Sequence, residues 1–218
     1  MPIERFFTEK EIEKIVKRSA QAPFAHRNTA LIMAATSWML TPFELTELRL
    51  KDVMDKSGEF YRIWTLPTWV AQNGVAREIE TADHINDIMI RYIDWWKANG
   101  LYESGLESYC GRKSDAPFIL NDNFEAYSLS KREKNGADVL PISMNNKLNS
   151  FIEKSGFKGA TASAFRDSAI RIMYENGAEY KELKYFTGIK TNSSLDKKIR
   201  PHEVEISQVL NRVFKNIK

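Results

Sequence analysis

The sequence predicts a mainly α-helical domain with one small antiparallel β-sheet, an α+β fold. Two helix-capping boxes precede stretches in which apolar residues recur at helical spacing. Two short segments rich in strand-forming residues flank an Asn-Gly turn between residues 52 and 80. The length of 218 residues suits one compact domain, and the hydrophobic share of 43% is ordinary for a globular protein.

The first half of the chain carries the clearest helix signals. Thr8-Glu9-Lys10-Glu11 is a capping box that opens a helix to about Ser19, and Thr41-Pro42-Phe43-Glu44 is a second one. Residues 27–39 are apolar on most faces and predict a buried helix. Residues 83–98 predict a long amphipathic helix.

The predicted sheet lies between these helices. Residues 60–64 and 75–79 are expected to form strands around a loop that contains Pro67 and Asn73-Gly74. Trp69 lies in this loop. An exposed tryptophan there would contact a partner or a nucleic acid, whereas burial is the common fate of this residue type.

The second half is expected to complete one domain that spans residues 1–200. Residues 99–142 predict a mobile, mostly irregular insert, and helices are expected over 143–155, 161–176 and 179–187. Residues 201–218 predict a tail helix, which would mediate self-association or pack back on its own domain. Its apolar stripe consists of Ile206, Val209, Leu210, Val213 and Ile217.

Composition excludes several classes of protein. No stretch approaches the roughly 20 apolar residues that cross a bilayer, and the N-terminus lacks a signal-peptide core, so no membrane association is expected. The single cysteine, Cys110, fits a reducing cytoplasm. The three histidines are too scattered for a metal site. The net charge of +3 permits nucleic-acid binding without arguing for it.

Several segments resemble, in order, the conserved boxes of the tyrosine recombinase (phage integrase) family. Residues 27–53 are similar to the first box, and residues 73–79 resemble the β-hairpin of the family. Residues 161–169 are similar to the His-x-x-Arg-His box, and residues 183–189 to the Leu-Gly-His box. The resemblance implies a recombinase catalytic domain, from about residue 6 to about residue 200, without the N-terminal DNA-clamping domain.

The resemblance also locates the catalytic positions. The family joins a tyrosine to a DNA phosphate without metal or cofactor, and uses arginines, a lysine and histidines around that phosphate. The six matching positions hold Thr41, Gln72, Ser163, Arg166, Ile189 and Lys198. Arg166 alone matches, and no tyrosine follows Tyr185. The resemblance therefore implies loss of DNA cutting, and no catalytic residue or cofactor is expected.

Two of these positions have a second interpretation. Thr41 is explained as the N-cap of its helix. Arg166 would contact a phosphate, or would be a partly buried arginine paired with Glu44 or Asp167. Asp167 replaces the second histidine of its box, and its carboxylate would repel a phosphate.

Residual DNA binding would depend on a small set of side chains. The stretch 190–200 corresponds to the nucleophile segment of the family, and a solvated loop is the alternative for it. The DNA-binding candidates are Arg166, Arg77, Gln72, Lys190, Lys197, Lys198 and Arg200.

Three functions remain open from the sequence. The first is an inactive, recombinase-like protein that binds double-stranded DNA as an accessory or regulatory factor of a mobile genetic element. The second is an interaction or structural module that kept the fold without DNA. The third is an active recombinase with a displaced nucleophile.

Overall fold

Helices dominate the fold, and the strands form two separate antiparallel hairpins. The computed structural model describes residues 5–132 and 138–199. Within these ranges the elements are α1 (Glu9–Ser19), α2 (Ala25–Ser37), α3 (Pro42–Glu47), α4 (Leu50–Val53), β1 (Ile63–Leu66), β2 (Arg77–Glu80), α5 (Asp83–Ala98), α6 (Ser108–Gly111), β3 (Ser130–Arg132), β4 (Asp138–Leu140), α7 (Ile142–Lys154), α8 (Ala164–Glu175), α9 (Tyr180–Thr187) and α10 (Asn192–Ile199).

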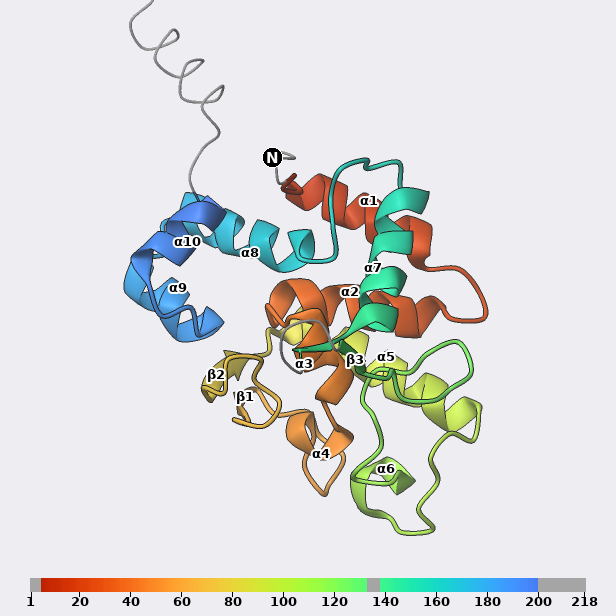
Figure 1. Ribbon diagram of the computed structural model, residues 1–218. Helices are drawn as coiled ribbons and strands as arrows, with labels where there is room; N and C mark the ends of the chain where they lie inside the picture. The colour runs from red at the N-terminus through yellow and green to blue at the C-terminus, as the bar shows by residue number, and fades with distance from the viewer. Residues whose placement is uncertain (1–4, 133–137, 200–218) are drawn as a thin grey trace, which may run out of the picture.

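The α2 helix lies at the centre of the fold. It packs against α1, α5 and α8, and α7 covers α1 and α3 (Figure 1). Its buried residues include Ala30, Leu31, Ile32 and Ala34, which point in different directions around the helix axis. A helix that is apolar on most faces is stable only when other helices surround it. The predicted buried helix is therefore confirmed, and it begins two residues earlier than expected, at Ala25.

The first hairpin pairs β1 with β2 in antiparallel register, with Leu66 opposite Arg77. Burial alternates along both strands, so that one face turns to the core. The predicted strands were placed too early. Phe60 forms an isolated antiparallel bridge with Met54 rather than extending β1, which therefore starts at Ile63.

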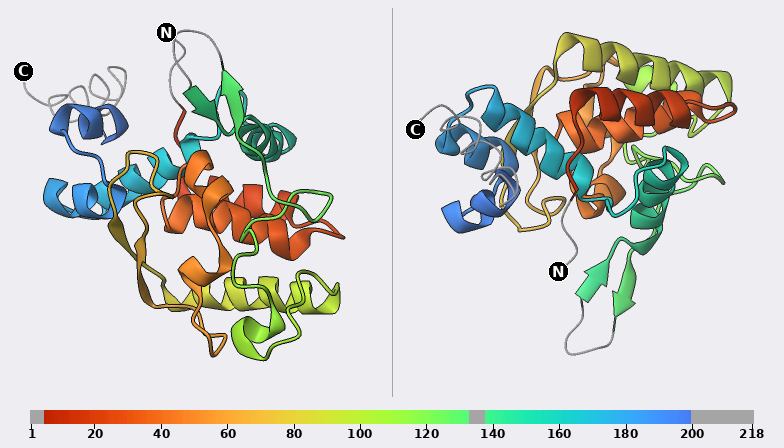
Figure 2. Two further views of the ribbon diagram at one scale, coloured as in Figure 1. Left: turned by 60° about the horizontal axis from the view of Figure 1, so that its bottom comes forward. Right: turned by 90° about the horizontal axis from the view of Figure 1, so that it is seen from above.

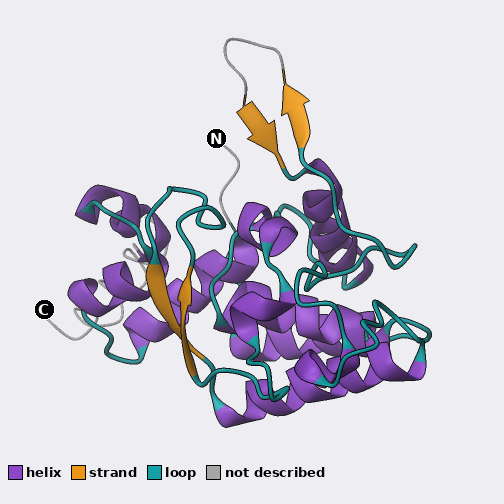
Figure 3. Cartoon of the chain, turned by 90° about the horizontal axis from the view of Figure 1, so that it is seen from below, coloured by secondary structure: helices purple, strands orange, loops and turns teal. Residues whose placement is uncertain are grey.

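The second hairpin, β3 and β4, was not predicted. It projects from the body of the molecule (Figures 2 and 3). Its strands carry no run of alternating apolar residues, because they do not cover a core, so the usual strand signal is missing. The sequence Asn135-Gly136 between them is typical of hairpin turns and was the available clue.

The predicted insert is tied to the core through its middle. Phe118, Ile119 and Leu120 are fully buried or nearly so. The Tyr92 hydroxyl of α5 donates a hydrogen bond to the carbonyl of Phe118 at 3.0 Å, and Tyr102 donates to the carbonyl of Phe124 at 3.0 Å. The segment contains little regular structure, but residues 116–120 form part of the hydrophobic core.

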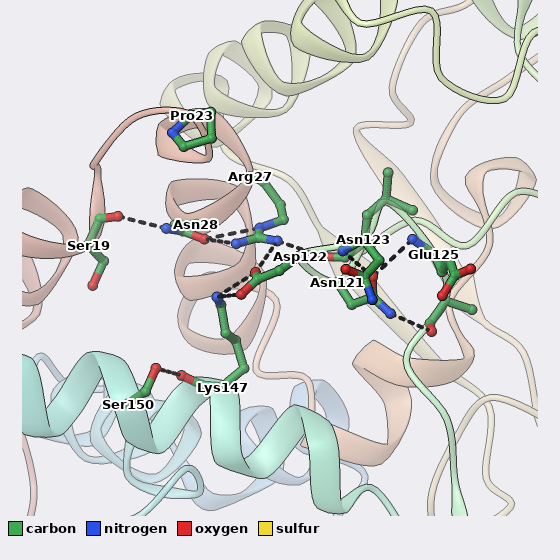
Figure 4. A network of polar contacts seen from close by, with 12 residues as sticks. Ser19, Pro23, Arg27, Asn28, Asn121, Asp122, Asn123, Glu125, Lys147 and Ser150 are labelled. Carbon is green, nitrogen blue, oxygen red and sulfur yellow. Dashed lines mark hydrogen bonds and ion pairs between the residues drawn. The ribbon is translucent and has the colours of Figure 1, made fainter.

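A buried arginine connects this segment to two helices (Figure 4). The guanidinium of Arg27 on α2 is completely buried, donates to the side chain of Asn28 and pairs with Asp122 at 2.7 Å. Lys147 on α7 reaches the same carboxylate at 2.7 Å. Burial raises the pKa of Asp122, but the hydrogen bonds and charges of Lys147 and Arg27 outweigh it and leave the pKa below its usual range.

The C-terminal described helices form a second, smaller cluster. Leu195 and Ile199 on α10 are buried together with Ile170 of α8 and Leu183 of α9. The described part of the charged stretch, residues 190–199, is thus largely helical rather than a solvated loop, because the spacing of Leu195 and Ile199 gives α10 one apolar face. The expected tail helix lies outside the described residues. No helix in the described ranges is long and apolar enough to cross a membrane.

Candidate functional site

The site is built around the N-terminus of α3. Thr41 is the N-cap, as predicted: its side chain accepts a hydrogen bond from the amide of Glu44 at 3.3 Å. Glu44 in turn accepts from the amide of Thr41 at 2.8 Å, which completes the capping box. Both residues are buried, so the cap is shielded from water. Position 41 therefore serves the helix and presents no cationic group.

Glu44 also holds the strand β2 against α3. The Arg77 guanidinium donates to both carboxylate oxygens of Glu44, at 2.7 and 2.8 Å, and both side chains are only 2% exposed. The amide of Gln72 donates to the same carboxylate at 3.2 Å. Burial raises the pKa of Glu44, but the hydrogen bonds and charge of Arg77 outweigh it, and the pKa lies below its usual range. Glu44 is thus ionised and shared by three elements of structure.

Arg166 on α8 lies on the edge of this cluster. Its side chain is half-buried, and one terminal nitrogen donates to the carbonyl of Thr187 at the end of α9. Burial lowers the pKa of Arg166, Glu44 opposes this change, and Arg77 adds to it. The buried Nε of Arg166 has no hydrogen-bond partner among the described residues, and neither does the Nε of Arg77. Arg77 therefore makes the direct contacts with Glu44, and Arg166 interacts with the same carboxylate through its charge.

The second interpretation of Arg166 is only partly correct: the side chain is partly buried, but among the described residues it forms no ion pair with Glu44 or Asp167. Both oxygens of Glu44 accept from Arg77. Asp167 pairs with Lys198 of α10, whose Nζ lies 2.7 Å from a carboxylate oxygen. In the same region, the Tyr180 hydroxyl of α9 donates to Asp196 at 2.6 Å. These contacts connect α10 to α8 and α9, and they account for the placement of Lys198.

Two further catalytic positions implied by the family resemblance lie near α8 and α9. Ser163 immediately precedes α8, is exposed, and shares a hydrogen bond of 2.9 Å with Thr161. Ile189 is partly buried against the smaller apolar cluster, and its amide donates to the side chain of Thr187 at 3.2 Å. Neither side chain carries a group that titrates near neutral pH.

The sequence matches no protein-family model and no curated protein. Among solved structures, a XerA recombinase superposes with a TM-score of 0.69 over 98% of this chain and 66% of that chain, at 11% identity. A Tn1549 transposon integrase in complex with transposon DNA superposes with a TM-score of 0.64 over 99% and 67%, at 13% identity.

This chain has the tyrosine recombinase catalytic fold. A XerH site-specific recombinase bound to its substrate also matches, with a TM-score of 0.62, 16% identity and 94% coverage of this chain. The chain spans about two thirds of the XerA recombinase and 52% of the XerH recombinase. The resemblance inferred from the sequence boxes is thereby confirmed for the fold, at identities too low for sequence comparison alone.

Within this recombinase fold, three of the DNA-binding candidates lie at the capping box, and a fourth, Lys198, lies on α10. Gln72 and Arg77 contact Glu44, Arg166 lies beside them, and Lys198 pairs with the residue that follows Arg166. Lys190 and Lys197 are exposed, on the turn before α10 and on α10 itself. Arg200 lies outside the described residues. No cluster of three metal-binding side chains occurs in the part of the chain that the structure describes.

Two features of the site were missed by sequence reasoning. Glu44 was identified as part of a cap and as a carboxylate partner for Arg166, but its pairing with Arg77 was missed. The contact between the hairpin loop and α9 was also missed. The Asn73 side chain donates to the carbonyl of Gly188 at 2.7 Å, and two residues 115 positions apart leave no local sequence signal.

Proposed function

We propose that this chain is a recombinase-fold protein that binds double-stranded DNA without cutting it, as an accessory or regulatory factor of a mobile genetic element. Several of the similar structures are recombinases or integrases in complex with DNA, and one of these is the Tn1549 transposon integrase with transposon right end DNA. The fold therefore suits a DNA partner, while the chemistry of this particular site argues against strand cleavage.

The observation that carries the proposal is the ion pair between Asp167 and Lys198. The family resemblance assigns Lys198 to the position of the nucleophilic tyrosine and Asp167 to a histidine position. The Lys198 side chain is bonded to a carboxylate at 2.7 Å and has no hydroxyl, so it does not supply the phenolic oxygen with which a tyrosine attacks a phosphate.

The arginine cluster supports the same proposal. Phosphoryl transfer depends on cations that converge on the extra negative charge of the transition state. Here Thr41 offers a hydroxyl already used as a cap, and both terminal nitrogens of Arg77 are bonded to Glu44. Arg166 is the remaining cation of the cluster, and one charge suffices to hold a phosphate but not to replace a catalytic set.

The proposal is tested by measuring affinity for labelled duplex DNA over a range of salt concentrations. Binding through phosphate contacts weakens linearly in log–log form, with a slope of about −0.9 for each phosphate neutralised. Absence of binding at low salt would favour the interaction module that kept the fold without DNA.

A second measurement addresses cleavage. A nicked suicide substrate traps any covalent protein–DNA adduct, and no adduct is expected. A trapped adduct would contradict the proposal and identify a displaced nucleophile, for which Tyr185 is the first variant to examine because its side chain on α9 is 51% exposed. Replacement of Tyr185 by Phe would then abolish the adduct.

A further inference from the structure

Trp69 is the most exposed large hydrophobic residue of the described chain, at 73%. It lies in the loop between β1 and β2. Among the described residues its indole takes part in no ring pair, cation–π contact or hydrogen bond. The remaining tryptophans each pack against another aromatic ring; these are Trp38, Trp64, Trp95 and Trp96. An isolated, exposed indole is unusual, because a soluble protein gains stability by covering it.

The loop holds this ring on a fixed base. Val70 and Ala71 are buried directly after it, and their amides donate to the carbonyl of Pro67 at 3.0 and 2.9 Å. The amide of Gln72 is bonded to Glu44, and the side chain of Asn73 to Gly188. A ring presented from an ordered backbone loses little conformational entropy when it binds.

A glycine permits the second of these anchors. Gly188 ends α9 in the left-handed region, at φ +69°, where other residues are strained. A Cβ at this position would lie 3.2 Å from Nδ2 of the Asn73 side chain. The close approach places the turn that carries the exposed Lys190 beside the hairpin loop.

The loop that carries Trp69 has no negative charge that would repel a polyanion. Residues 67–76 include no acidic residue, and the exposed Thr68, Gln72 and Asn73 supply hydroxyl and amide groups. The first acidic residue of the hairpin after the loop is Glu78, which lies on β2 opposite Thr65. A protein partner would be recognised by a wider apolar patch, whereas a single ring among uncharged polar groups matches the stacking of one base.

We infer that Trp69 stacks on an unpaired base of bound DNA, at a bulge, gap or locally melted pair. The inference rests on the proposed DNA binding and deepens it by naming the structural class of DNA. The bases of an intact duplex already stack on each other and offer no free face, so the indole would discriminate interrupted from continuous duplexes.

The experiment compares the affinity of the full chain for an intact duplex and for the same duplex with one unpaired base. The wild type is expected to bind the interrupted duplex more tightly. Trp69→Ala should lose roughly 5- to 150-fold in affinity for the interrupted duplex and little for the intact one, as is typical of a lost base stack. Trp69→Phe should retain most of the preference. Leu106→Ala, which removes another exposed apolar side chain, should change neither affinity.

The outcomes separate the two proposals. If the wild type binds intact duplex, and Trp69→Ala changes the affinity for both substrates by the same factor, the stacking role is overturned and the proposed function stands. Failure of the wild type to bind either substrate at low salt would overturn both. Because Trp69 is exposed, its variants should fold, and circular dichroism checks this directly.

Discussion

Lys198 Nζ lies 2.7 Å from a carboxylate oxygen of Asp167, and this contact joins the last described helix to α8. The side chains are 25% and 8% exposed, so the pair is partly shielded from water. Removing one partner of a shielded ion pair lowers stability more than removing one partner of an exposed pair. The pair therefore helps to hold α10 against α8. It also keeps the Lys198 ammonium group bonded to a carboxylate.

A double-mutant cycle measures this contact. Asp167→Asn, Lys198→Gln and the double variant should show a coupling free energy of about 1 kcal/mol in denaturant unfolding, within the range for contacting residues. An exposed pair, Glu13 and Lys17 on α1, serves as control and should show weaker coupling. A coupling near zero for the first pair would show that it does not hold α10.

Loss of Glu44 should be the most destabilising change in the site. Glu44→Gln leaves Arg77 buried without its charge partner, and breaking such a pair typically costs about 3–5 kcal/mol. Chemical denaturation of the variant measures the effect. Asp115→Asn, which breaks an exposed contact with Lys51, should leave stability nearly unchanged. Equal losses of stability in the two variants would contradict a special role for the buried Glu44–Arg77 pair.

The Glu44–Arg77 pair predicts that the stability of the fold depends on pH. The pKa of Glu44 is depressed in the folded state, so its stabilisation is complete above the ordinary glutamate pKa of about 4.3. As the pH falls through the lower folded-state pKa, the carboxylate is protonated and the contribution disappears. The difference in melting temperature between wild type and Glu44→Gln should therefore be large at neutral pH and shrink below pH ~4. A difference that stays constant with pH would exclude this linkage.

Local hydrogen bonds of the site could be predicted from the sequence, whereas its long-range contacts could not. The capping boxes at Thr8 and Thr41 were predictable because their hydrogen bonds span three residues. The ion pair of Arg77 and the contact of Asn73 with Gly188 were not, since long-range contacts leave no local pattern. The helix α10 was missed because its charges concealed the apolar spacing of Leu195 and Ile199.

The buried hydroxyl of Thr81 is expected to stabilise the core. The Thr81 hydroxyl accepts hydrogen bonds from the indoles of both Trp38 and Trp64, at 3.1 and 3.3 Å. Thr81→Val keeps the shape but leaves two buried donors unsatisfied, at about 1–3 kcal/mol each. Thr81→Ser retains the hydroxyl and should be much closer to wild type. Similar unfolding midpoints for the two variants would refute the shared-acceptor role.

Salt dependence tests the contribution of individual lysines to DNA binding. Lys190→Ala and Lys197→Ala each remove an exposed cation, and each should lower the steepness of the log affinity against log salt plot by about 1 if that lysine contacts a phosphate. Lys10→Ala, on the exposed face of α1, is the matched control and should leave the slope unchanged. Unchanged slopes in all three variants would place the DNA contacts elsewhere.

The capping box at Thr41 makes position 41 costly to change. An arginine there would remove an N-cap worth about 1 kcal/mol and add a third guanidinium next to a carboxylate already bonded to Arg77. Stability would fall at that step, before any other group of a catalytic set had been introduced. Directed evolution of strand exchange from this chain is thus expected to require several simultaneous substitutions, because the first single step is penalised by the helix cap.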